Sequence, residues 1–129
     1  MLVALGSLAS AQATSTKVTA ASLTRLLTYA ATHPDAILRY NASDLILHIH
    51  SDTSYLSEPK ACSRVEGHFF LSFNSANPSK QPATPAPNNG ALHTVSVILK
   101  YVMSSATEAE LAGLFQNAKD AAPLRVTLE

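Results

Sequence analysis

The chain has 129 residues, which is enough for one domain. Hydrophobic residues make up 47% of it and charged residues only 14%, a composition that allows a packed core and does not favour global disorder. Nine basic and nine acidic residues give a formal net charge of zero. Because no basic run is present, electrostatics alone does not favour a nucleic-acid partner.

Cysteine content and hydropathy limit the cellular setting. Cys62 is the only cysteine, which excludes an intrachain disulfide and a cysteine zinc site and fits a reducing compartment. No segment reaches the roughly 18 apolar residues of a membrane span, so no membrane partner is expected. Residues 1–13 end in Ala-Gln-Ala like a cleaved leader, but lack Lys and Arg. A helix of the fold in an intracellular protein, cytoplasmic or nuclear, is favoured over secretion.

The N-terminal part, residues 1–36, is predicted to be helical. Residues 1–13 are small and apolar, and a second helix is expected over 17–32 after the polar break at 14–16. Its apolar residues recur at helical spacing and predict one buried stripe, formed by Leu23, Leu26, Leu27 and Ala30. Pro34 disfavours helical geometry in the residue before it and so ends the helix.

Residues 37–73 contain strand patterns. A short strand is expected over 37–40, a turn over 41–44, and a longer strand over 45–54 that alternates with period two. The alternation puts Leu47 and Ile49 on one face, and it puts His48, His50 and Asp52 on the other. Residues 56–67 are polar and predict a loop, followed by an aromatic strand over 68–73.

The C-terminal part is expected to hold a loop, a strand region and a helix. The segment 74–90 carries four prolines and predicts an extended loop, and 92–103 predicts strand. A capping box, Ser105 at the N-cap and Glu108 at N3, opens a helix that runs to about residue 122, where Pro123 ends it. Its expected core-facing stripe consists of Leu111, Leu114, Phe115 and Ala118.

The order of these elements predicts an α+β fold. Three successive strands favour an antiparallel three-stranded sheet, with the N-terminal helices and one C-terminal helix packed on it. An acid at the end of a strand, Asp52, and an acid in a later helix, Glu110, are also the beginning of a carboxylate site for Mg²⁺, which prefers hard oxygen ligands.

Several short motifs carry a resemblance to a known family. Ser51-Asp52-Thr53-Ser54-Tyr55 ends a strand, Gly67-His68-Phe69-Phe70-Leu71 forms the next, and Ser104-Ser105-Ala106-Thr107-Glu108-Ala109-Glu110-Leu111 opens a helix. On the basis of these motifs, residues 37–129 resemble the N-terminal half of the ribonuclease H domain of retrotransposon polyproteins, closest to copia-type elements. Residues 1–36 resemble the segment that connects the reverse transcriptase to it.

The resemblance implies a function. The ancestral activity of that family is Mg²⁺-dependent hydrolysis of the RNA strand of an RNA–DNA hybrid. Asp52 would be its first metal-binding aspartate and Glu110 its catalytic glutamate, both of them catalytic residues and Mg²⁺ ligands. Glu108 is the alternative for the glutamate, although the capping box gives it another role.

The departures from the family imply an incomplete site. The family fold continues with a strand that bears a second aspartate, and this chain ends at Glu129 before that strand. An incomplete ribonuclease H-like fold, inactive as an isolated chain and with vestigial Mg²⁺ binding, is therefore expected from a polyprotein fragment. Its expected partners are an RNA–DNA hybrid, a reverse transcriptase, or a second copy that pairs with the exposed first strand.

Other interpretations remain open. The chain could be a non-catalytic interaction module that uses the open sheet edge or the proline-rich loop, or a small secreted protein with a cleaved leader. His48 and His50 lack an identifiable third metal ligand and are predicted to be sheet-face residues. Lys60 and Arg64 are predicted to lie in a solvated loop, and Cys62 has no nucleophile motif around it.

Overall fold

The computed structural model describes residues 1–73 and 86–129. Most of the proline-rich loop predicted over 74–90 therefore lies outside the described residues. The chain divides into two compact units, Met1–Ile37 and Leu38–Glu129.

The first unit contains α1 (Leu2–Ser10), the 3₁₀ turn η1 (Gln12–Thr14) and α2 (Lys17–Thr32). Thr16 caps α2: its Oγ1 accepts from the backbone N–H of Thr19 at 3.3 Å, and its own N–H donates to Thr19 Oγ1 at 3.2 Å. The two helices were correctly predicted. The expectation of one buried stripe was wrong, because Leu23 and Leu27 are 47% and 60% exposed. The nine-residue α1 is too short to cover sixteen residues of α2.

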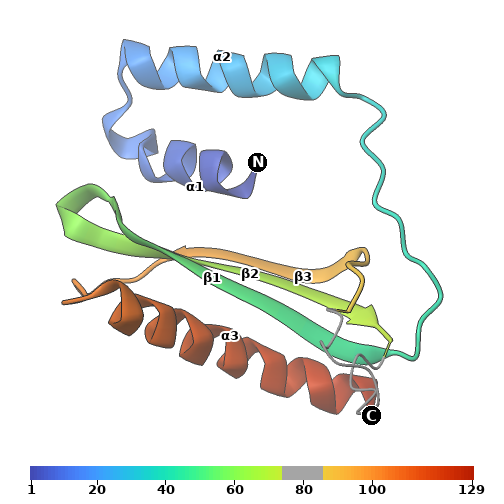
Figure 1. Ribbon diagram of the computed structural model, residues 1–129. Coiled ribbons are helices and arrows are strands. Elements are labelled where there is room, and N and C mark those ends of the chain that lie inside the picture. The colour runs from blue at the N-terminus through green and yellow to red at the C-terminus, as the bar shows by residue number, and fades with distance from the viewer. Residues whose placement is uncertain (74–85) are drawn as a thin grey trace. The chain divides into compact units, whose positions relative to one another are not determined.

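The second unit is a three-stranded antiparallel sheet with a helix on one face (Figure 1). Its strands are β1 (Ile46–Glu58), β2 (Cys62–Ser72) and β3 (Ala91–Ile98), in the spatial order β1-β2-β3. The helix α3 (Ala106–Leu128) follows β3 and lies mainly along β1. The predicted α+β class and antiparallel meander are confirmed.

The first hairpin is longer than the sequence predicts. Residues 62–67, expected to be loop, belong to β2 and pair with β1, with Ser51 opposite Gly67 and Asp52 opposite Glu66. The chain reverses over η2 (Pro59–Ala61), where Lys60 and Ala61 take positive φ values of 62° and 56°. The left-handed conformation at two successive residues makes the tight reversal that lets a polar sequence continue as strand.

Residues 37–40 do not form the predicted strand, and β3 ends at Ile98 instead of 103. The segment before β1 is tied to the sheet by side chains: the Tyr40 hydroxyl donates to the carbonyl of Ala91 at 3.0 Å. Asn89 accepts from the N–H of Asn41 at 2.7 Å and donates to the carbonyls of Asn41 and Leu71 at 2.9 and 2.8 Å. These bonds satisfy backbone groups that a strand would otherwise pair.

The two faces of β1 have different surroundings. Ser51 and Thr53 lie under α3, as their contacts with Asn117 and Gly113 show. His48 and His50 lie on the opposite face, where both rings pack on Phe70 at centroid distances of 5.6 and 5.0 Å. The period-two alternation predicted for this strand is confirmed.

The helix α3 packs on the sheet through its small side chains. Ala109, Gly113 and Asn117, spaced four residues apart, are its buried residues. The predicted core-facing stripe was wrong: Leu111, Leu114 and Phe115 are 65%, 57% and 67% exposed. Gly113 explains the choice of face, because a Cβ built there would lie 2.0 Å from Thr53 Oγ1. The helix backbone approaches β1 too closely for a larger residue.

Pro123 does not end α3, contrary to the prediction. The helix continues to Leu128, with the Thr127 hydroxyl donating to the Pro123 carbonyl at 2.9 Å and Arg125 pairing with Glu129 at 2.9 Å. The proline removes one backbone hydrogen bond, but it lies on the exposed surface, where water can satisfy the freed carbonyl.

We expect Gly113→Ala to destabilise the chain by about 1–3 kcal/mol, although alanine has the higher helix propensity, because the added methyl group meets Thr53. Urea unfolding followed by circular dichroism measures the change. Thr53→Ala removes the opposing hydroxyl, which is buried and has no hydrogen-bond partner among the described residues, so the double variant should recover most of the loss.

A Gly113→Ala variant as stable as the parent chain would contradict the close approach of α3 to β1. Ala118→Gly, at an exposed position of the same helix, is the control for helix propensity alone.

Candidate functional site

Asp52, expected at the end of its strand, lies in the middle of β1, because the strand continues to Glu58, and it is on the face of the sheet away from α3. Its neighbours Ser51 and Thr53 both contact α3, so the alternation of the strand directs Asp52 to the opposite side. Its side chain is exposed, and Oδ1 accepts the backbone N–H of Thr53 at 2.9 Å. Across the hairpin Asp52 is directly opposite Glu66, another acid.

Glu110 lies on the second turn of α3 and on the other side of β1. It is exposed and lines a shallow hollow between α3 and the edge of the sheet, together with Ser51, Thr107, Leu111 and Leu114. The acid thus faces the edge of β1 beside Ser51, not Asp52.

The structure therefore does not bring the two predicted metal ligands to one face. A Mg²⁺ ion shared by Asp52 and Glu110 would need both carboxylates to converge on one point. With β1 itself between the two side chains, this arrangement does not fit a two-carboxylate Mg²⁺ site.

Glu108, the alternative to Glu110, is engaged at the start of α3. Its Oε2 accepts from the backbone N–H of Ser104 at 2.6 Å and from the Ser104 hydroxyl at 2.5 Å. Ser105 is the N-cap, and its hydroxyl accepts from the N–H of Glu108 at 3.1 Å. These bonds to Ser104 lower the pKa of Glu108 below its ordinary value of 4.5. Glu108 therefore serves the helix terminus, but only half of the predicted capping box forms, because its carboxylate bonds to Ser104 and not to the N–H of the N-cap Ser105.

The sequence did not predict a cluster of four polar side chains on the face of the sheet that carries Asp52. His50 is opposite His68, and Asp52 is opposite Glu66, so two imidazoles and two carboxylates lie next to each other on one face of the β1–β2 ladder. The imidazole rings lie 6.4 Å apart between centroids. Within residues 1–73 and 86–129, no three His, Cys, Asp or Glu side chains form a group that could hold a metal ion. Only the pairing of β2 from residue 62 reveals this arrangement.

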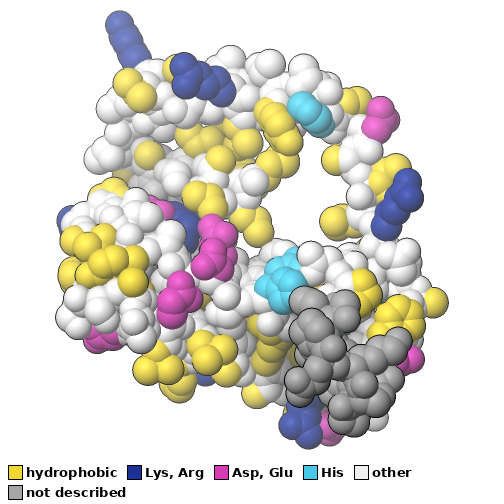
Figure 2. All heavy atoms as spheres, in the orientation of Figure 1, with side chains coloured by type: hydrophobic (Ala, Val, Ile, Leu, Met, Phe, Trp, Pro, Cys, Tyr) yellow, Lys and Arg dark blue, Asp and Glu magenta, His cyan; other side chains and the backbone are white. Residues whose placement is uncertain are grey.

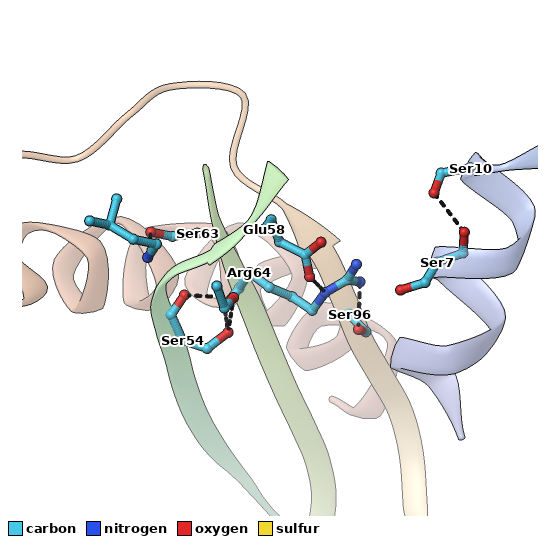
Figure 3. Close-up of polar contacts among 9 residues, drawn as sticks. Ser7, Ser10, Ser54, Glu58, Ser63, Arg64 and Ser96 are labelled. Carbon is cyan, nitrogen blue, oxygen red and sulfur yellow. Dashed lines mark hydrogen bonds and ion pairs between the residues drawn. The ribbon is translucent and has the colours of Figure 1, made fainter. Parts of the chain in front are cut away.

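Arg64, predicted to be in a solvated loop, is a buried residue of β2. Its Nε pairs with the carboxylate of Glu58, and its Nη1 donates to the Ser96 hydroxyl at 3.2 Å (Figure 3). Only 3% of the Arg64 side chain is exposed, compared with 14% for Glu58. The guanidinium is thus used within the sheet and is not presented to a phosphate backbone.

Two exposed features meet at the edge of the sheet. The strand β1 has thirteen residues and, in the described part of the chain, pairs only with β2. The exposed face of α3 carries Leu111, Leu114 and Phe115, and hydrophobic side chains are visible at the surface over the region that α3 occupies (Figure 2). Unpaired strand edges and contiguous apolar patches are the usual features of a protein-binding surface.

Comparisons with known proteins give no relative: no family model, no curated protein and no solved structure shows a significant match to the chain. Among the helices described here, none has both the length and the apolar character needed to cross a bilayer.

We expect the pKa of Glu108, measured by NMR titration, to lie below 4.5 and to rise in a Ser104→Ala variant, which loses the hydroxyl donor. Because the folded-state pKa is lowered, the stabilisation of the helix terminus is complete above about pH 4.5. It is lost as the pH falls through the lowered pKa.

Thr107→Ala, at an exposed neighbouring position, is the matched control and should leave the pKa of Glu108 unchanged. A Glu108 that titrates identically with and without the Ser104 hydroxyl would contradict its role in the cap.

Proposed function

We propose that the chain is a ribonuclease H-like fragment of a retroelement polyprotein that does not cleave RNA by itself. The sequence motifs around Asp52 and Glu110 support the proposed relation to the ribonuclease H family. The order of three antiparallel strands followed by a helix agrees with the beginning of that fold. No wider likeness supports it.

The expectation that the chain does not cleave RNA rests on one observation. Asp52 is on the face of β1 opposite to α3, whereas Glu110 is on α3. Phosphodiester cleavage by metal ions depends on carboxylates that hold two ions about 4 Å apart, in line with the attacking and leaving oxygens. Carboxylates on opposite sides of a strand do not provide that geometry, so we expect weak Mg²⁺ binding or none.

A second candidate function is a protein-interaction module. The unpaired edge of β1 and the exposed apolar face of α3 favour it, because strand addition to an open edge is a recurrent mode of protein recognition. The two candidates are compatible, since a fragment that has no catalytic centre keeps its sheet and its open edge.

The nuclease question is tested with a labelled RNA–DNA hybrid and the purified chain in millimolar Mg²⁺. We expect no cleavage above that of an Asp52→Asn variant, and the same result for Glu110→Gln. Circular dichroism of each sample must show that the chain is folded.

Mg²⁺-dependent cleavage by the parent chain that both substitutions abolish would overturn the proposal, because the two acids would then act together. Glu129→Gln, which removes an exposed acid at the opposite end of α3 from Glu110, is the control for loss of negative charge.

A further inference from the structure

We propose that the open edge of β1 binds a second copy of the same chain, by antiparallel β1–β1 pairing around a two-fold axis at Ser51. This inference rests on the interaction-module function proposed above and names its partner. It does not depend on nuclease activity, because the oligomeric state is measured independently of cleavage. A failure of either proposal can therefore be told from a failure of the other.

Charge complementarity along β1 carries the argument. In an antiparallel pair with Ser51 opposite Ser51, each His50 lies directly opposite the Asp52 of the other copy. Both side chains are exposed and point to the same face of the sheet. The pairing therefore forms two equivalent contacts in which an imidazole N–H of one copy can donate to the carboxylate of the other, and hydrogen bonds to an ionised carboxylate are among the stronger ones.

Among the described residues of one chain, Asp52 and His50 have few hydrogen-bond partners. Asp52 accepts one N–H, from Thr53, and faces Glu66 across the hairpin, where like charges destabilise the pair. His50 packs on Phe70 but has no hydrogen bond in the described part of the chain. A second copy supplies a donor to Asp52 and an acceptor to His50 at the same time.

Neighbouring registers satisfy these groups less well. With His50 on the axis, the two His50 side chains would face each other and Asp52 would face His48, whose Nε2 is already 3.0 Å from the Phe73 carbonyl. With Asp52 on the axis, two aspartates would face each other. The Ser51 register also keeps the paired segment, 48–54, within the regular part of β1, which ends at the irregularity after Ser54.

The second contribution comes from α3. The side-chain amide of Asn117 donates to Ser51 Oγ at 2.7 Å, so the middle of α3 lies over the proposed axis. A two-fold axis perpendicular to the sheet places both α3 helices on the same face, antiparallel and next to each other. Leu114, which lines the hollow beside Ser51, would then lie between the helices, with Leu111 beside it. Burial of these exposed side chains adds an apolar contribution to the polar one.

The charge contact is tested by analytical ultracentrifugation of the whole chain over a range of concentrations. We expect a monomer–dimer equilibrium. His50→Asp places like charges opposite each other twice and should raise the dimer Kd by about tenfold or more. The double variant His50→Asp, Asp52→His again places an imidazole opposite a carboxylate in this register and should return the Kd to near that of the parent chain.

The register is tested by disulfide cross-linking in a Cys62→Ser background. Ser51→Cys puts the two thiols on the axis, within reach of a disulfide, because facing residues of an antiparallel pair have Cβ atoms about 4.5–5.5 Å apart. Ile49→Cys is the matched control on the same face. Its thiols face Thr53 of the other copy and lie too far from each other to bond.

The results that support the proposed dimer differ from those that overturn it. A dimer weakened by His50→Asp, rescued by the double variant and cross-linked through position 51 supports the proposal. Leu114→Glu, at a position 57% exposed in one chain, should also favour the monomer without loss of fold. A chain that circular dichroism shows to be folded and that stays monomeric up to about 100 μM overturns the proposal, as does a dimer that cross-links through Ile49→Cys and not through Ser51→Cys.

Discussion

The packing of the small face of α3 against β1 is the constraint on which the rest of the second unit depends. Gly113 lets the helix backbone approach Thr53, and Asn117 fixes the helix along its length by donating to Ser51 Oγ at 2.7 Å and to the Glu66 carbonyl at 3.1 Å. A buried amide with two hydrogen bonds specifies one position of the helix on the sheet more strictly than aliphatic packing does. The cost is that the larger apolar side chains of the helix face outward.

The same constraint decides what the carboxylates can do. Since Ser51 and Thr53 must face α3, the residue between them cannot, and Asp52 is left on the other side of the sheet. There it adjoins Glu66 and His50 instead of Glu110. The geometry that anchors α3 thus separates the two acids that the motifs associate with each other, and it leaves an unpaired strand edge beside an exposed apolar helix face. This arrangement is the basis of the binding function proposed above.

Features that depend on local periodicity could be predicted from the sequence. Features that depend on side-chain volume or on strand pairing could not. The alternation of His48, His50 and Asp52 and the Ser105 cap were predictable because each depends on local spacing. The face of α3 was not, because the rule that large apolar residues are buried ignores how closely Gly113 allows the helix to approach. The sequence did not predict that the polar residues 62–67 begin β2. Arg64 in this segment pairs with Glu58 across the hairpin, a contact that composition does not show.

The central claim, that α3 packs through Gly113 and Asn117, is tested most directly by nuclear Overhauser effects in the isotopically labelled chain. We predict cross-peaks from the Asn117 side-chain amide to Ser51 and Gly67, and from the Gly113 α-protons to the Thr53 and Val65 methyl groups. The Phe115 side chain should show no contacts to the sheet of its own chain, and Leu111 should contact only the edge of β1 beside Ser51. Strong cross-peaks from Leu111 or Phe115 to Val65 within one chain, with none from Asn117, would show that the large face packs inward and would contradict the account.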